Sequence, residues 1–467
     1  MCKCRTRFAP SPTGYMHIGN LRSALYNYLI SKSLGGKFIL RIEDTDNKRQ
    51  IEGAEQIIYD TLESTGLIYD EGPSVGGNFG PYIQSERKDI YLKYSKILVD
   101  RGGAYYCFCG KKDDNSSCNC RDLSAEEVES FLAEKKSYVV RQKMPKEGFT
   151  GFDDLVFGHI EVENSELEDQ ILIKSDGMPT YNFANVVDDH LMQISHVIRG
   201  CEYLSATPKY NLLYESFGWE IPTYVHLPLI MGKNPDGTVT KLSKRAGAVS
   251  FFDLVNEGYL PEAIINYIAF LGWCPSSNKE IFSLSELVKE FSIDNIGKSP
   301  SIFDYEKLQW VNAQHIKLLS DESFANMAKK YVNFDVDLGK LSKILKSRIS
   351  KFDQIPEMID FLREIPKFDK ELFLNKKNKT NEENVPIILE KSVEVLEKIS
   401  DWNNDKLFEK LVKLSDDMSL KKNSVMWVVR IAISGKQITP GGATEILEIL
   451  GKEESLERLN NSLKLWK

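Results

Sequence analysis

The 467-residue sequence has no apolar run long enough to cross a membrane and no excess of positive charge. Its most apolar stretch, residues 263–274, is much shorter than the roughly 20 residues that a transmembrane helix needs. Residues 1–12 contain no apolar core of the kind found in secretory signals. Lys and Arg number 60 against 68 Asp and Glu, and the resulting net charge of −8 argues against non-specific nucleic-acid binding. We therefore expect a cytoplasmic protein in which any RNA contact depends on local basic surface.

Cysteine is scarce except in one short segment. Four of the eight cysteines fall within residues 107–120 as two Cys-x-Cys pairs separated by eight residues. Four thiolates in a loop-rich segment can close a tetrahedral zinc site, which would be structural because no coordination position stays open for water. The alternative interpretation is four reduced cysteines with no ligand. The predicted ligands are Cys107, Cys109, Cys118 and Cys120.

The hydrophobic pattern changes twice along the chain. Strand, turn, helix and strand follow one another over residues 4–43, which is typical of a parallel α/β sheet. The pattern is interrupted after about residue 85, resumes near residue 194, and becomes helical from about residue 251. We predict a Rossmann-type α/β domain split by an α+β insertion and followed by all-α domains. The predicted limits are 1–85 with 191–250, 86–190, 251–318, 319–384 and 385–467.

The sequence HIGN, residues 17–20, lies between a predicted strand and a predicted helix. The amino end of a helix offers unpaired N–H groups and partial positive charge, which suit a phosphate. Gly19 would let a nucleotide approach the backbone, and His17 can donate a hydrogen bond to a phosphate oxygen. By itself this motif is weak.

A second basic motif, KLSKR, occupies residues 241–245 after a glycine-bearing turn. Lys241 and Lys244 on a loop can neutralise charge on a departing pyrophosphate. Alone, the motif would be interpreted as a solvated basic loop. The two motifs together, each beside a recurrence of the α/β pattern, are far more specific.

With these motifs in place, the sequence resembles the class I aminoacyl-tRNA synthetases and, more narrowly, the bacterial glutamyl-tRNA synthetases. The matching segments include RFAPSPTGYMHIGN at residues 7–20, RIEDTD at 41–46, HVIRG at 196–200, KLSKR at 241–245 and TPGGATEILEILGKE at 439–453. They span nearly the whole chain. The resemblance implies ATP, glutamate and tRNA(Glu) as substrates, magnesium with ATP, and a monomeric state. It also implies that the insertion binds the tRNA acceptor end, that 251–318 contacts the tRNA stem, and that the last two domains bind the anticodon.

The resemblance assigns roles to individual residues. A glutamate pocket is implied at Arg7, Ala9, Ser11, Glu43, Tyr181, Asn185 and Arg199. ATP contacts are implied at His17, Gly19, Asn20, Glu202, Lys241, Ser243 and Lys244, with His17, Lys241 and Lys244 as the catalytic group. The chemistry agrees, because arginine matches a carboxylate and offers no acceptor to an amide NH₂, so it favours glutamate over glutamine.

Three alternatives stay open on the sequence alone. A glutaminyl-tRNA synthetase shares the catalytic start, but its tRNA-reading end is built from β-barrels, whereas residues 320–467 are predicted to be helical. A truncated relative that glutamylates a tRNA base lacks the anticodon-binding half. A catalytically inactive RNA-binding paralogue would not need His17, Glu43, Arg199, Lys241 and Lys244 intact.

Overall fold

The computed structural model describes residues 4–46, 51–110, 119–234, 236–242 and 250–466. These residues form two compact units. The first contains residues 1–255 and 261–307, and the second contains residues 256–260 and 308–467. The predicted fold class is confirmed, while the finer domain limits given above stay predictions.

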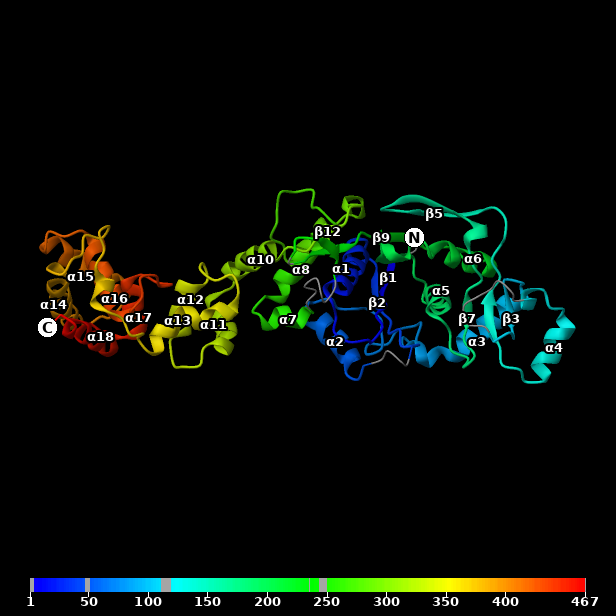
Figure 1. The fold of residues 1–467 in the computed structure, drawn as a ribbon, viewed down its shortest axis with the longest axis horizontal. Coiled ribbons are helices and arrows are strands. Elements are labelled where there is room, and N and C mark those ends of the chain that lie inside the picture. The colour runs from blue at the N-terminus through cyan, green and yellow to red at the C-terminus, as the bar shows by residue number, and fades with distance from the viewer. Residues whose placement is uncertain (1–3, 47–50, 111–118, 235, 243–249, 467) are drawn as a thin grey trace. The chain divides into compact units, whose positions relative to one another are not determined.

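The first unit is built on short parallel strands that are buried throughout their centres. Strand β1 (Arg5–Phe8) pairs with β2 (Lys37–Leu40), and β8 (His196–Gly200) pairs with β9 (Thr223–Leu227). Helix α1 (Ile18–Ser33) connects β1 to β2 and lies beside them (Figure 1). Its apolar face is fully buried, as the helical spacing of Leu21, Leu25 and Leu29 predicts. The first unit therefore has the expected β–α–β beginning.

The insertion is a mixture of strands and helices, as predicted. Strands β3 (Ala104–Cys107), β4 (Val139–Gln142) and β7 (Ile171–Ile173) form one sheet. Strand β5 (Phe149–Asp154) forms a hairpin with β6 (Gly158–Glu163) and also pairs with β9, which joins the insertion to the main sheet. The helices between residues 54 and 217 are α2 (Ala54–Ser64), α3 (Lys88–Asp100), α4 (Ala125–Ala133), α5 (Tyr181–Leu191) and α6 (Thr207–Phe217).

The first unit extends beyond the point where the helical pattern begins. Helices α8 (Pro261–Ala269) and α9 (Leu284–Glu290) pack on α1, and the Tyr26 hydroxyl donates to the carbonyl of Ala269 at 3.0 Å. Strand β12 (Ser301–Ile302) pairs with β10 (Ile230–Lys233), which also pairs with β11 (Val239–Lys241). Further helices here are α7 (Phe251–Asn256) and α10 (Tyr305–Leu318), which ends in the second unit.

Helices are the regular elements of the second unit, and residues 308–466 as described contain no extended strand. Residues 375–384 contain a bridge between Asn375 and Thr380 and lead into helix α14 (Asn384–Glu397). No helix among the described residues is both long enough and apolar enough to span a membrane. The helices are α11 (Asp321–Ala328), α12 (Leu338–Leu345), α13 (Ile355–Arg363), α14 (Asn384–Glu397), α15 (Asn404–Asp417), α16 (Lys422–Ser434), α17 (Ala443–Leu450) and α18 (Lys452–Lys464) (Figure 1).

Candidate active site

A cavity of about 810 Å³ opens at the carboxyl ends of the parallel strands in the first unit. Ligands of open α/β sheets bind at this edge, where loops from neighbouring strands converge. The loop after β1 contributes Ala9 and Ser11, the chain after β2 contributes Glu43, and the end of β8 contributes Arg199. Eleven predicted site residues line this one cavity: Arg7, Ala9, Ser11, His17, Gly19, Asn20, Glu43, Tyr181, Arg199, Glu202 and Lys241.

The amino end of α1 forms one side of the cavity. His17 immediately precedes the helix in an extended conformation, and its backbone bridges to Ser250. A Cβ atom built on Gly19 would meet no atom within 4 Å, so this part of the helix faces open space. No acidic side chain lies in the first helical turn. The end of the helix therefore presents its backbone and partial positive charge to the cavity, as an anion requires.

Arg7 belongs to a buried network of charges beneath the cavity. Its Nε donates to Oδ1 of Asp189 at 3.0 Å, and Arg41 donates to the same carboxylate oxygen at 2.7 Å. Burial opposes ionisation of Asp189, but the two arginines outweigh it and lower the pKa of this carboxyl. Arg41 also donates to Glu43 at 2.9 Å. Arg41 thus connects Arg7 to Glu43, since it donates hydrogen bonds to the carboxylates of both Asp189 and Glu43.

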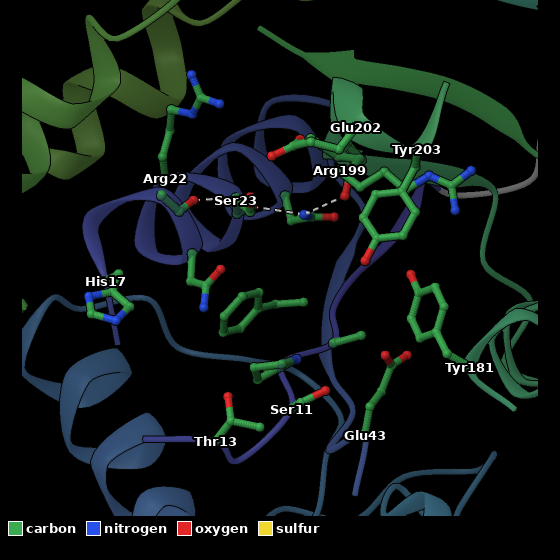
Figure 2. Close-up of a pocket in the computed structure, with 18 of the residues that line it drawn as sticks. Ser11, Thr13, His17, Arg22, Ser23, Glu43, Tyr181, Arg199, Glu202 and Tyr203 are labelled. Carbon is green, nitrogen blue, oxygen red and sulfur yellow. Dashed lines mark hydrogen bonds between the residues drawn. The ribbon is translucent and has the colours of Figure 1, made fainter. Parts of the chain in front are cut away.

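Glu43, Tyr181 and Tyr203 lie together at the opposite side of the cavity from His17 (Figure 2). The rings of Tyr181 and Tyr203 are 5.5 Å apart between centroids. Burial raises the pKa of Glu43, although the neighbouring Arg41 lowers it in part. A buried carboxylate beside aromatic rings is a strong partner for a substrate ammonium group, because little water competes for it.

Arg199 stands at the end of β8 and is only 7% exposed. Its Nη2 donates to the Thr207 hydroxyl at 2.7 Å, and its Nε donates to Nε2 of His226 at 3.2 Å. Within the described part of the chain, its remaining nitrogen, Nη1, has no hydrogen-bond partner and the guanidinium forms no ion pair. Arg199 therefore brings a positive charge to the cavity with donor capacity left for an anionic ligand.

The basic loop is only partly described. Lys241 ends β11, and its Nζ lies 2.5 Å from Oε1 of Glu202. The predicted ATP contacts Ser243 and Lys244 lie outside the described residues. Asn185 is buried one turn after Tyr181, donates to the Tyr181 carbonyl at 2.9 Å, and is not among the residues that line the cavity.

Arg22 and Tyr203 also line the cavity, and no role was assigned to either from the sequence. Arg22 lies one helical turn after Gly19 on α1, and Tyr203 follows Arg199 by four residues. Helical spacing from the HIGN motif could have indicated Arg22. Its guanidinium donates to the backbone carbonyls of Leu271 and Pro228, so it also ties α1 to the chain beyond it.

Three of the four clustered cysteines lie close together. The sulfur atoms of Cys107, Cys109 and Cys120 all lie within 4.8 Å of one another, and those of Cys107 and Cys109 are 3.2 Å apart. Cys118 lies outside the described residues. Sulfur atoms at such separations can share a tetrahedral metal ion, because each Zn–S bond is about 2.3 Å long.

Comparisons with known proteins match the whole chain. Residues 3–310 match the family described as tRNA synthetases class I (E and Q), catalytic domain, and residues 323–463 match an anticodon binding domain. A glutamate–tRNA ligase of Clostridium kluyveri is 53% identical over 100% of this chain and 99% of its own length. One of Clostridium novyi is 54% identical over 99% of this chain and 98% of its own. The crystal structure of a glutamate tRNA ligase from Elizabethkingia meningosepticum in complex with its amino acid superposes with a TM-score of 0.89, at 35% identity and full coverage of both chains.

Proposed function

The chain belongs to the class I tRNA synthetases, in the glutamate–tRNA ligase branch, and from this we propose how its cavity residues divide the reaction. Enzymes of this branch activate glutamate with ATP and transfer it to tRNA(Glu). The observation that carries the proposal is the convergence of Arg7, Arg199 and Glu43 on the cavity that also contains the amino end of α1.

Glutamate would occupy the side of the cavity formed by the two arginines and Glu43. Arg7 and Arg199 suit its two carboxylates, and Glu43 suits its ammonium group. Ala9 and Ser11 would form the wall of the glutamate site beside Arg7. Tyr181 and Asn185 would support this site from α5. A glutamine side chain would place an NH₂ donor against an arginine donor, so the site should reject it.

ATP would lie toward the amino end of α1. His17, Gly19 and Asn20 would contact its phosphates, with Glu202 and Ser243 as further contacts. Lys241 and Lys244 would offset the charge on the pyrophosphate as it leaves. Magnesium, which family membership implies with ATP, would further neutralise the phosphates.

No general base is required for the first step, because the carboxylate that attacks the α-phosphate is already ionised near neutral pH. The contribution of the chain is therefore to hold the carboxylate and the phosphate in reach of each other and to stabilise developing charge. The helical second unit would bind the anticodon, as the match to an anticodon binding domain suggests.

The clustered cysteines would hold a structural zinc ion. The close approach of the sulfurs of Cys107, Cys109 and Cys120 supports this, and Cys118 would be the fourth ligand. Such an ion would stabilise the insertion, since four thiolates leave no open position for chemistry.

Aminoacylation of purified tRNA(Glu) and tRNA(Gln), each with glutamate and with glutamine, tests the proposed function. We expect glutamate to be joined to tRNA(Glu). Joining of glutamine to tRNA(Gln) would support a glutaminyl enzyme instead, and absence of any product would support an RNA-binding paralogue without catalysis. If glutamate is joined to both tRNAs, the proposed glutamate site stands and the enzyme accepts tRNA(Gln) as well as tRNA(Glu).

A further inference from the structure

The Arg199 side chain is held by groups that carry no charge. His226 lies opposite Arg199 in the register of β8 and β9, and its Nε2 accepts from Nε of Arg199 at 3.2 Å. The Thr207 hydroxyl donates to the Tyr203 carbonyl at 2.8 Å, so it is an acceptor toward Nη2 of Arg199. Rings complete the surroundings: the guanidinium carbon lies 5.0 Å from the centroid of Tyr203, 4.7 Å from that of Tyr210 and 5.6 Å from that of Tyr224.

This arrangement requires one particular form of His226. Arginine can only donate, so Nε2 of His226 must carry no proton and the ring must be neutral with its proton on Nδ1. Nδ1 lies 2.7 Å from Oδ2 of Asp154, which is positioned to accept that proton's hydrogen bond. Burial and the neighbouring Arg199 lower the pKa of His226, whereas Asp154 raises it. The lowering influences are the larger, and they keep the ring neutral.

Asp154 is itself fixed by the backbone. Its Oδ1 accepts from the N–H groups of Val156 and Phe157 at 2.9 and 2.8 Å, and its Oδ2 accepts from the N–H of His226 at 2.9 Å. Burial opposes ionisation of this carboxyl, but the hydrogen bonds from His226 and the two N–H groups outweigh it and lower the pKa of Asp154. The side chains of both Asp154 and His226 are fully buried. Neither residue lines the cavity, so they reach a ligand only through Arg199.

Arg7 offers an informative contrast. Its guanidinium is paired directly with the carboxylate of Asp189, which offsets much of its charge. Arg199 bonds to His226, and His226 bonds to the carboxylate of Asp154. The imidazole ring of His226 therefore separates this carboxylate from the guanidinium. The ring transmits orientation but does not neutralise Arg199 by direct contact.

We propose that Asp154 and His226 are positioning residues that hold Arg199 toward the amino-acid side chain while leaving its charge available for a carboxylate. The proposal rests on the proposed function, because it assumes that Arg199 binds glutamate. It assigns to His226 the role of a neutral acceptor, and to Asp154 the selection of the tautomer that makes His226 an acceptor.

The first test is made on the unsubstituted protein without substrate, and a variant serves only to assign the signal. In protein labelled with ¹⁵N-histidine, the nitrogen shifts of His226 should identify a neutral ring with its proton on Nδ1, and the His226→Gln variant assigns the signal among the six histidines. A proton on Nε2, or a charged ring at neutral pH, would overturn the proposal.

The second test separates positioning from folding. His226→Leu removes the acceptor and should raise the KM for glutamate by about 10- to 100-fold, because a hydrogen bond to a charged group is lost. The KM for ATP should stay within about twofold, because ATP does not depend on Arg199 in the proposed site. His226→Gln keeps an acceptor oxygen and should recover most of the glutamate affinity. Equal losses for glutamate and ATP in both variants would indicate a merely structural role and contradict the proposal.

The hairpin β5–β6 supplies matched controls. Asp153 and His159 form a similar pair, 2.8 Å apart, but their side chains are 87% and 62% exposed. Asp154→Asn should raise the glutamate KM in the same range as His226→Leu, because the amide can donate to Nδ1 and favour the wrong tautomer. Asp153→Asn and His159→Gln should leave it unchanged. If Arg199→Lys itself leaves the glutamate KM unchanged, the proposed function of Arg199 fails, whereas the nitrogen shifts still report whether His226 orients it.

Discussion

Single side chains in the first unit differ in how their charge is compensated. Arg7 shares Asp189 with Arg41, while Arg199 rests on Thr207 and His226. A buried guanidinium with neutral partners binds an anion more strongly than one already paired, because low local polarity strengthens the attraction. Arg199 is therefore the side chain whose loss should most affect glutamate recognition.

Arg199→Lys keeps the positive charge but removes the planar group that reaches His226, Thr207 and the ligand together. We expect the KM for glutamate to rise by roughly 10- to 100-fold, since a charge-assisted hydrogen bond is lost. Steady-state aminoacylation at varied glutamate concentration measures this. Arg101→Lys is the control, because Arg101 is exposed and donates to the Phe217 carbonyl outside the cavity. A similar increase in both variants would contradict the assigned role.

Glu71 should make the stability of the first unit depend on pH. Hydrogen bonds from Arg5, Lys37 and Tyr82, opposed in part by burial, lower the pKa of Glu71 from 4.5 to about 2. Its side chain is only 3% exposed, so solvent screens these contacts little. A carboxyl with a depressed folded-state pKa stabilises the fold above its unfolded pKa and loses that contribution as pH falls through the folded value.

Glu71→Gln should therefore lower the free energy of unfolding by up to about 3 kcal/mol at neutral pH. The difference from the unsubstituted protein should shrink as pH falls from 4.5 toward 2. Urea unfolding of both proteins over this range measures it, with the solvent-exposed Glu129→Gln on α4 as control. A difference that does not change with pH would mean that Glu71 contributes by packing and not by charge.

At the scale of elements, α5 links the cavity to the buried charges. Tyr181 in its first turn lines the cavity, while Asp188 and Asp189 near its end bind arginines from other segments. Asp188 accepts from Nε of Arg87 at 2.7 Å and from the Tyr91 hydroxyl at 2.8 Å, and is fully buried. The position of this one helix therefore depends on contacts made at both of its ends.

Asp188→Ala should destabilise the first unit by about 3–5 kcal/mol, because it leaves a buried arginine without its counter-charge. Chemical unfolding measures the loss. Glu166→Ala, an exposed acidic residue of the same insertion, should change stability by no more than about 0.5 kcal/mol. A small effect of Asp188→Ala would show that Arg87 finds another acceptor.

The cysteine cluster gives a second prediction at this scale. Purified protein should contain about one zinc ion per chain by elemental analysis, and Cys107→Ser should lose it, because thiolate is the better zinc ligand. Cys274→Ser, an exposed cysteine outside the cluster, should keep it. Zinc that survives in Cys107→Ser, or that is absent from the unsubstituted protein, would remove the metal from the proposal.

The sequence predicted the helices and strands better than it predicted contacts between residues that are far apart along the chain. Local spacing predicted β1 and α1, because hydrophobic periodicity acts over a few residues. Local spacing could not predict the partners of Asp188 and Asp189, since Arg87 lies 101 residues from the first and Arg41 lies 148 from the second. The pair of Arg199 and His226, 27 residues apart, required the register of two neighbouring strands.

At the scale of the whole molecule, the boundary between units does not follow the change in pattern. The sequence turns helical at about residue 251, yet the first unit continues to residue 307. Arg22 and Tyr26 of α1 bond to carbonyls near residue 270, which ties those helices to the α/β sheet. Helical periodicity identifies an apolar face but not the surface that covers it, so this assignment needed the structure.

The central claim is that Arg199 selects a carboxylate where a glutamine side chain carries an amide. Amino-acid-dependent exchange between ATP and pyrophosphate, with tRNA(Glu) present, tests it most directly. We predict exchange with glutamate that exceeds exchange with glutamine by roughly a thousandfold or more, because an arginine left facing an NH₂ group has no partner. Equal exchange with the two amino acids, or faster exchange with glutamine, would contradict the claim.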